Sequence, residues 1–113
     1  MYSEIRPWGK FTNLYDKSYT KVKTILVSPG QRLSLQSHKK RSENWIVVRG
    51  IATVELDDAT FTLEPGQSIF IPVGSKHRLE NKQDTELEII EVQTGSYFGE
   101  DDITRYSDDY NRV

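Results

Sequence analysis

The sequence predicts an all-β fold, either a sandwich or a barrel. Short runs rich in Val, Ile, Thr and Phe recur through the middle of the chain, and Gly or Pro interrupts them at close spacing. No segment shows an amphipathic helical period over three turns. The length of 113 residues suits one domain, which we place at 1–113 with a barrel core over about 20–93.

Eight strands are expected in this core, in close succession. They are 21–28, 32–38, 43–49, 51–56, 60–64, 67–72, 76–81 and 86–93. The glycines between or after them are best explained as turn residues: Gly30, Gly50, Gly66 and Gly74. The two ends of the chain are polar and aromatic, with weak periodicity. Asp101 and Asp102 suit a helix N-terminus, which favours a turn of helix in EDDITRY (100–106).

The composition excludes several classes of protein. The chain has no cysteine, so disulfides, thiolate metal sites and thiol nucleophiles are absent. Fifteen basic and seventeen acidic residues give a net charge of −2, which argues against a general grip on nucleic acid. No apolar run approaches the roughly 20 residues needed to span a membrane, and the N-terminus is not signal-like. We therefore expect a cytoplasmic protein that binds neither nucleic acid nor membrane.

Four side chains suggest a metal site. Gln36 and His38 share one face of a strand because side chains at i and i+2 point the same way. If the KKRS segment turns the chain back, Glu43 approaches that face, and a barrel can bring His77 beside it. Two nitrogen and two oxygen donors suit Zn²⁺, Fe²⁺, Mn²⁺, Co²⁺ or Ni²⁺. A lone strand histidine is more often hydrogen-bonded or solvated, so residue types alone leave both interpretations open.

The spacing of these residues is more specific. One block runs Gly30, five residues, Gln36-Ser37-His38, four residues, Glu43, six residues, Gly50. The other runs Gly66, five residues, Pro72-Val73-Gly74, two residues, His77, three residues, Asn81. Both blocks resemble the two motifs of the cupin superfamily, although the usual motif has histidine where this chain has Gln36. The resemblance implies a small double-stranded β-barrel of the jelly-roll type.

A closer resemblance covers nearly the whole chain. Segments 7–11, 19–54, 71–81 and 91–110 resemble the type II phosphomannose isomerases, in particular the C-terminal half of the bifunctional mannose-1-phosphate guanylyltransferase/mannose-6-phosphate isomerases. That family's core is Q-x-H-x-x-R-x-E-x-W, and it is carried here by Gln36, His38, Arg41, Glu43 and Trp45. The resemblance implies that Gln36 is the family's own ligand. It implies an isomerase of GDP-mannose biosynthesis that needs a divalent ion, with zinc the first choice. The Gly-rich signature of the nucleotidyltransferase half is absent, so we expect no guanylyl transfer.

The expected reaction converts mannose 6-phosphate to fructose 6-phosphate through an enediol. The resemblance implicates Arg41, which we assign to stabilising oxyanions or phosphate because arginine stays protonated; the alternative is a solvated charge in the KKRS turn. Lys23 is a candidate base or phosphate contact, or else a solvated residue at a strand edge. Trp45 is a candidate sugar platform or core residue, and Arg78 and Arg105 are candidate phosphate contacts.

Two other functions remain open. One is a non-catalytic cupin that binds a sugar or sugar phosphate, or serves as a subunit of a separate guanylyltransferase. The other is a different cupin activity, such as a sugar epimerase or an oxygenase. We also expect a homodimer, because cupins often pair. The aromatic residues at the two ends can cover either a partner or the chain's own barrel: Trp8, Phe11, Tyr97, Phe98, Tyr106 and Tyr110.

Overall fold

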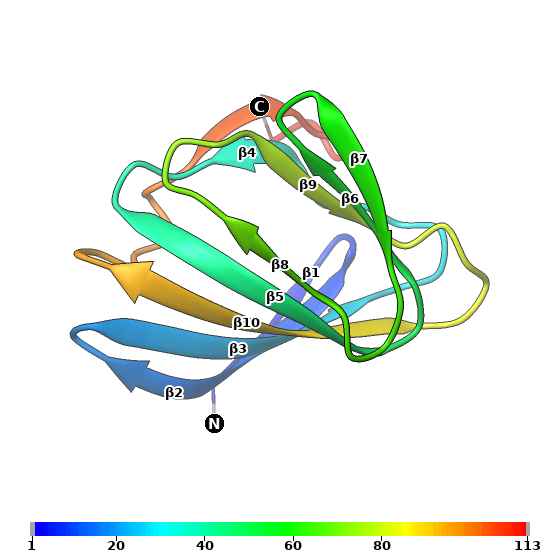
Figure 1. Cartoon of the computed structure of the whole chain (residues 1–113), viewed down its shortest axis with the longest axis horizontal. Helices are drawn as coiled ribbons and strands as arrows, with labels where there is room; N and C mark the ends of the chain where they lie inside the picture. The colour runs from blue at the N-terminus through cyan, green and yellow to red at the C-terminus, as the bar shows by residue number, and fades with distance from the viewer. Residues whose placement is uncertain (1, 113) are drawn as a thin grey trace.

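Two antiparallel β-sheets face each other and enclose the interior (Figure 1). The computed structural model describes residues 2–112, which contain no α-helix and hence none long and apolar enough to cross a membrane. The six-stranded sheet has the order β1-β2-β3-β10-β5-β8, and the five-stranded sheet has the order β11-β4-β9-β6-β7. The strands are β1 (Ser3–Arg6), β2 (Gly9–Lys17), β3 (Thr20–Val27), β4 (Leu35–Ser37), β5 (Arg41–Arg49), β6 (Ala52–Leu56), β7 (Ala59–Leu63), β8 (Ser68–Ile71), β9 (His77–Glu80), β10 (Leu87–Gly95) and β11 (Thr104–Ser107). The all-β prediction is confirmed.

All eight expected strands are present as β3 to β10, and three further strands were not expected. Strands β1 and β2 form a hairpin at one edge of the larger sheet, and β11 lies at an edge of the smaller one. The turn of helix expected in EDDITRY is wrong, because Thr104 pairs with Ser37 on β4 and Asp101 and Asp102 lie in the turn before β11. The hydrogen bonds available along the edge of β4 outweigh the weak local preference for a helix.

Residues 38–40 link the two sheets, and Arg41 and Ser42 already belong to β5, so KKRS (39–42) is not a hairpin turn. Strand β4, before this link, pairs with β9 and β11, whereas β5, after it, pairs with β10 and β8. The expectation that the chain turns back onto a neighbouring strand is therefore wrong. As a consequence, His38 and Glu43 meet across the interior of the barrel and not along one face of a hairpin.

The inner face of the larger sheet changes from apolar to polar along its central strands. On β10 the inward side chains at i and i+2 spacing are Leu87 and Ile89, followed by Glu91 and Gln93, and all four are buried. The neighbouring strands change in the same direction. On β3 the polar Lys23 comes before the apolar Ile25 and Val27, and on β5 the polar Arg41 and Glu43 come before the apolar Trp45 and Val47. One end of the barrel is thus an apolar core, and the other is a buried polar site.

The two ends of the chain close this barrel. Trp8 and Phe11 are part of the buried core cluster, and Tyr110 packs against it. For these aromatic residues, the alternative that they cover the chain's own barrel is confirmed, whereas Tyr97 and Tyr106 are exposed. The C-terminal segment crosses the polar end of the barrel, where its main chain contacts the site described next.

Candidate functional site

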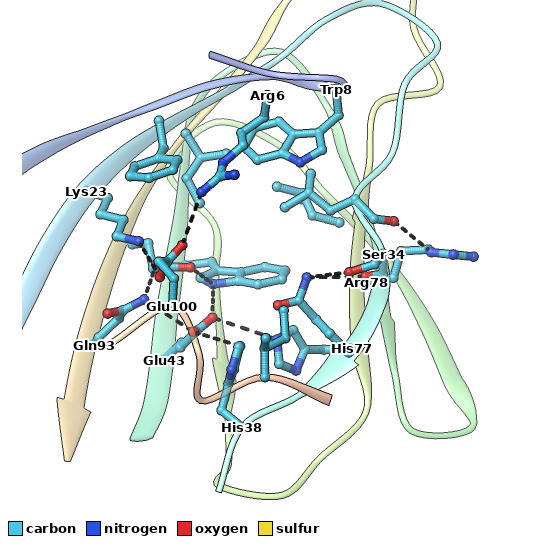
Figure 2. Close-up of a pocket in the computed structure, with 18 of the residues that line it drawn as sticks. Arg6, Trp8, Lys23, Ser34, His38, Glu43, His77, Arg78, Gln93 and Glu100 are labelled. Carbon is cyan, nitrogen blue, oxygen red and sulfur yellow. Dashed lines mark hydrogen bonds and ion pairs between the residues drawn. The ribbon is translucent and has the colours of Figure 1, made fainter. Parts of the chain in front are cut away.

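Side chains from both sheets point into a pocket at the polar end of the barrel (Figure 2). Its ionisable lining comprises six cationic side chains (Arg6, Lys23, Arg41, Arg78, Arg105 and Arg112), three carboxyl groups (Glu43, Glu91 and Glu100), His38 and His77. The whole chain carries a net charge of −2, so this surplus of cations is a local property of the pocket. Such a lining favours a negatively charged ligand.

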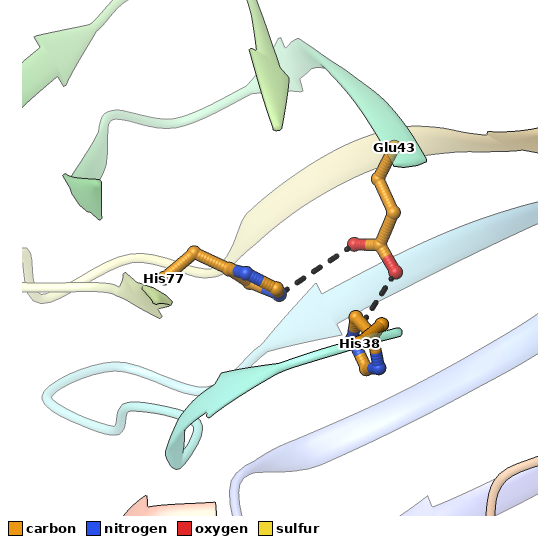
Figure 3. Close-up of side chains that lie close together, drawn as sticks. All are labelled: His38, Glu43 and His77. Atoms are coloured by element: carbon orange, nitrogen blue, oxygen red, sulfur yellow. Dashed lines mark ion pairs between the residues drawn. The ribbon is translucent and has the colours of Figure 1, made fainter. Parts of the chain in front are cut away.

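His38, Glu43 and His77 converge inside this pocket (Figure 3). The Nε2 atom of His38 lies 3.4 Å from Glu43 Oε2, and Nε2 of His77 lies 3.9 Å from Glu43 Oε1. All three side chains are buried, and one donor atom from each lies within 4.8 Å of the other two. They come from three places: the end of β4, the start of β5 and the start of β9.

Main-chain carbonyl groups fix the tautomer of both histidines. Nδ1 of His38 lies 2.6 Å from the carbonyl oxygen of Asp102, and Nδ1 of His77 lies 3.0 Å from that of Ser75. A carbonyl oxygen can only accept, so each Nδ1 carries the proton and each Nε2 presents a lone pair toward Glu43. The buried Nε2 of His77 has no hydrogen-bond partner among the described residues. Two lone pairs and a carboxylate facing one point fit a bound cation.

The protonation states agree with this fit. Burial, and after it the nearby Arg41 cation, together lower the pKa of His38 to about 4. Burial also lowers the pKa of His77. Both imidazoles are therefore neutral at pH 7, which is the state that binds a metal ion. The three residues form a possible metal site, and neither histidine would have to release a proton for a metal ion to bind.

Gln36, the fourth expected ligand, lies beside His77 in the sheet. The two residues are partners in the β4–β9 pairing, and both line the pocket. The amide nitrogen of Gln36 donates to the hydroxyl of Ser34 at 3.0 Å. Since Ser34 holds the nitrogen, the amide oxygen is the atom available to an ion. Coordination by Gln36 stays a prediction.

Arg41 is buried at the centre of the site, so the alternative of a solvated turn residue is wrong. It is the first residue of β5 and shares the inner face with Glu43, two positions later. Its Nε donates to Glu43 Oε2 at 3.1 Å, and its Nη2 lies 3.4 Å from Nε2 of His38. A third nitrogen donates to the carbonyl oxygen of Gly99, at 3.2 Å. The guanidinium group therefore contacts two of the possible metal ligands.

A carboxylate–indole network, which sequence reasoning missed in part, supports Glu43. The indole Nε1 of Trp45 donates to Glu43 Oε1 and to Glu91 Oε2, both at 3.0 Å. Gln93 Nε2 donates to Glu91 Oε1 at 2.7 Å. Burial raises the pKa of Glu91 to about 8, and the charge of Glu43 adds to this rise, so Glu91 is a neutral acid at pH 7. The sequence signal for this network was the alternation in ELEIIEVQ (86–93): Glu91 and Gln93 continue the same strand face as the apolar Leu87 and Ile89.

Lys23 is also buried in the pocket, and it does not lie at a strand edge. Strand β3 runs between β2 and β10, and the ammonium group lies 4.3 Å from the centre of the Phe11 ring. Its Nζ donates to Glu100 Oε2 at 3.3 Å. Burial raises the pKa of Glu100, but the Lys23 and Arg41 cations outweigh burial and hold that pKa below its usual value. An ionised Glu100 thus ties the C-terminal segment to the site.

The fold and site can now be compared with known proteins. The family model described as the mannose-6-phosphate isomerase C-terminal domain matches residues 2–108. The chain belongs to this family. Similar solved structures support the cupin fold: the capsular polysaccharide assembling protein CapF of Staphylococcus aureus has a TM-score of 0.80 at 21% identity over 94% of this chain and 32% of that one. KdgF of a Halomonas species has a TM-score of 0.77 at 16% identity over 83% and 86% of the two chains.

Members of the mannose-6-phosphate isomerase C-terminal family are found at high identity in longer proteins. The alginate biosynthesis protein AlgA of Pseudomonas aeruginosa is 54% identical over 96% of this chain and 22% of its own length. The xanthan biosynthesis protein XanB of Xanthomonas campestris is 50% identical over 96% and 23%. A mannose-1-phosphate guanylyltransferase of Sinorhizobium fredii is 47% identical over 93% and 20%. The chain spans about a fifth of the length of these relatives.

The remaining candidate residues of this mannose-6-phosphate isomerase C-terminal domain differ in what they contact. Trp45 lines the pocket and belongs to the core, and its ring packs against that of His77 in a T-shaped arrangement with the ring centres 5.6 Å apart. Arg78 is buried, and it donates to the carbonyl oxygens of Leu33 at 3.0 Å and Ser107 at 3.1 Å. It braces β9 against the C-terminal segment. Arg105 lines the pocket from β11. Substrate contacts by all three stay predictions.

Proposed function

We propose that this domain is a metal-dependent isomerase that interconverts mannose 6-phosphate and fructose 6-phosphate. The observation that carries the proposal is the convergence of His38, Glu43 and His77 beside the buried guanidinium group of Arg41. Membership in the mannose-6-phosphate isomerase C-terminal family and the cationic pocket support the same reaction.

The donor set suits zinc, and Co²⁺, Mn²⁺, Fe²⁺ and Ni²⁺ are the alternatives. His38, His77 and Glu43, with the amide oxygen of Gln36, would hold the ion through two nitrogens and two oxygens. The chemistry that a divalent ion held by these residues would supply is Lewis-acid polarisation of the sugar oxygens. Trp45 holds Glu43 in position through its indole N–H, and the two main-chain carbonyl groups hold both imidazoles.

The isomerisation moves a proton between C1 and C2 and places negative charge on the adjacent oxygens. We assign Arg41 to these oxygens, because a buried, permanently charged guanidinium group stabilises charge that develops beside it. Lys23 already donates to Glu100, so we assign its ammonium group to electrostatic contact with the substrate and not to proton abstraction.

A second candidate is a sugar-phosphate-binding domain without turnover, acting as part of a guanylyltransferase. It is favoured by the relatives, one of which is named a mannose-1-phosphate guanylyltransferase and of which the chain covers only a fifth. The same pocket would then bind a sugar phosphate without isomerising it. An epimerase or oxygenase gains no support from these matches.

One assay separates the two candidates. The purified chain is mixed with mannose 6-phosphate in the presence of Zn²⁺ or Co²⁺, and fructose 6-phosphate is measured with a coupled reporter enzyme. Turnover in a loaded sample supports the isomerase, and its absence from folded, metal-loaded protein refutes it. Elemental analysis of wild type against the double variant His38→Ala/His77→Ala tests the ligands. Equal metal content in the two proteins would refute the proposed site.

A further inference from the structure

Arg105 shares one line across the smaller sheet with two residues of the possible metal site. It is the partner of Gln36 in the β11–β4 pairing, and Gln36 is the partner of His77 in the β4–β9 pairing. Paired residues on neighbouring strands project to the same face. Two strand spacings separate the backbones of Arg105 and His77 by about 10 Å. Both side chains line the same pocket, so Arg105 is placed at a fixed distance from the metal end.

The guanidinium group of Arg105 lacks a partner where other arginines have one. Its Nε is buried, and no acceptor within residues 2–112 bonds to it. By contrast, Arg112 makes a two-pronged pair with Asp108, at 2.8 and 2.7 Å, and Arg32 does the same with Asp109, at 2.7 and 2.9 Å. A buried charged donor without an acceptor is costly, so the pocket presents a cation that a ligand can satisfy.

The other cations of the pocket are already occupied. The Arg41 guanidinium group pairs with Glu43, Lys23 pairs with Glu100, and Arg78 donates to main-chain carbonyls. Arg6 and Arg112 also line the pocket, and their charges act on Arg105. Burial and the Arg112 cation together lower the pKa of Arg105, which confirms that like charges are crowded there. Arg105 is therefore the pocket cation whose N–H donor is available to a ligand.

We propose that Arg105 anchors the phosphate group of the substrate, with Arg6 and Arg112 supplying the surrounding positive field. A planar guanidinium group matches two phosphate oxygens at once. A hexose 6-phosphate carries its phosphate at the end opposite to C1 and C2, which matches the separation of Arg105 from the histidines. The identity of the sugar rests on the proposed function, but the anion subsite does not depend on metal or on turnover.

The test uses binding without catalysis. Metal-free protein, held in chelator, is titrated by calorimetry with inorganic phosphate, mannose 6-phosphate and unphosphorylated mannose. We expect wild type to bind both phosphates, with the sugar phosphate the tighter, and to bind mannose at least tenfold more weakly than mannose 6-phosphate. Arg105→Gln should weaken both phosphates at least tenfold, and Arg105→Lys should recover part of the loss because it restores the charge. Arg49→Gln is the matched control, since Arg49 is an exposed, ion-paired arginine.

The outcomes distinguish this subsite from the isomerase proposal. Phosphate binding that depends on Arg105, in a protein that gives no turnover after it is loaded with metal, would support the subsite and refute the isomerase. Turnover with an unchanged KM for mannose 6-phosphate in Arg105→Gln would refute the subsite alone. Arg105→Gln should melt at the wild-type temperature, because the side chain of Arg105 forms no ion pair among the described residues. Equal phosphate affinity in wild type and in folded Arg105→Gln overturns the inference.

Discussion

Replacing Arg41 with glutamine should strengthen metal binding while it abolishes isomerisation. The Nη2 atom of Arg41 lies 3.4 Å from Nε2 of His38, which is the atom that would face the ion. With a zinc–nitrogen bond of about 2.1 Å, the ion lies at most about 5.5 Å from that positive charge. The sign of the interaction is therefore repulsive, although the same guanidinium group pairs with Glu43.

The size of the effect follows from these separations. A divalent and a monovalent cation about 5.5 Å apart repel each other by about 6 kcal/mol at an effective dielectric constant of about 20. Two effects offset most of this repulsion: Arg41 holds Glu43 in position through the Nε–Oε2 contact at 3.1 Å, and solvent at the mouth of the pocket screens the charges. We expect at least about 1.4 kcal/mol to remain, which is a tenfold tighter metal complex in Arg41→Gln. Turnover should fall by at least about a hundredfold, because the variant lacks the buried charge that stabilises the oxyanion.

The assay is competition with a chromophoric chelator, followed by turnover of the same loaded samples. Arg49→Gln removes an equal charge from an exposed position and should change neither quantity. If Arg41→Gln binds metal more weakly than wild type, the main effect of Arg41 is to hold the metal ligands in position and not to repel the ion. Unchanged turnover in the loaded variant would refute its role in catalysis.

Three further outcomes are expected. Zinc at a hundred times its dissociation constant should stabilise the wild type by about 2.7 kcal/mol in a thermal melt, and a zinc-independent melting temperature would contradict the site. Arg112 holds the pKa of Asp108 at about 2, below its unfolded value of 3.8. The free energy of unfolding in urea should therefore be about 2 kcal/mol larger for wild type than for Asp108→Asn at pH 7. About half of this difference should be lost by pH 3, because the pH then falls toward the folded pKa of Asp108. A difference that does not change with pH would refute this reasoning. A Cβ at Gly95 would lie 2.2 Å from the carbonyl oxygen of Lys40. Gly95→Ala should therefore lower the free energy of unfolding by about 2 kcal/mol or more in the same assay. An unchanged stability would show that the backbone around Lys40 moves aside without cost.

Much of the barrel was predictable because its strands bury side chains on an alternating face. Most of the runs that became β3 to β10 carry Val, Ile or Phe between turn residues, whereas the runs of β4 and β9 carry only Leu as an apolar residue. The strands β1, β2 and β11 were not predictable in this way, since they are stabilised by pairing with other strands and not by their local pattern: the β1–β2 hairpin adds to β3, and β11 adds to β4. EDDITRY illustrates the difference, because Asp101 and Asp102 resemble a helix start only when β4 is left out of account.

The candidate site divides along the same line. His38, Glu43 and His77 were identified from the spacing of the two motifs. The hydrophobic pattern of a single strand does not show which distant residues come into contact, whereas the motif spacing does. Glu91 belongs to no such spacing and reaches the site through the β10–β5 register, which pairs it with Trp45. Arg41 is buried because β5 begins at this residue, directly after the link between the two sheets. The polar composition of KKRS gives no indication of this burial.

The buried side-chain atoms without a hydrogen-bond partner, taken together, point to one ligand. Among the described residues, four buried side-chain atoms lack a hydrogen-bond partner, and three of them line this one pocket. They are Nε2 of His77, Oε1 of Gln93 and Nε of Arg105. Each such atom costs about 1–3 kcal/mol if it stays without a partner, so their gathering in one pocket favours a ligand that supplies the partners. A lone pair calls for a cation, an amide oxygen for a hydroxyl donor and a guanidinium nitrogen for an anion. A divalent ion, a sugar hydroxyl and a phosphate group meet these three needs together.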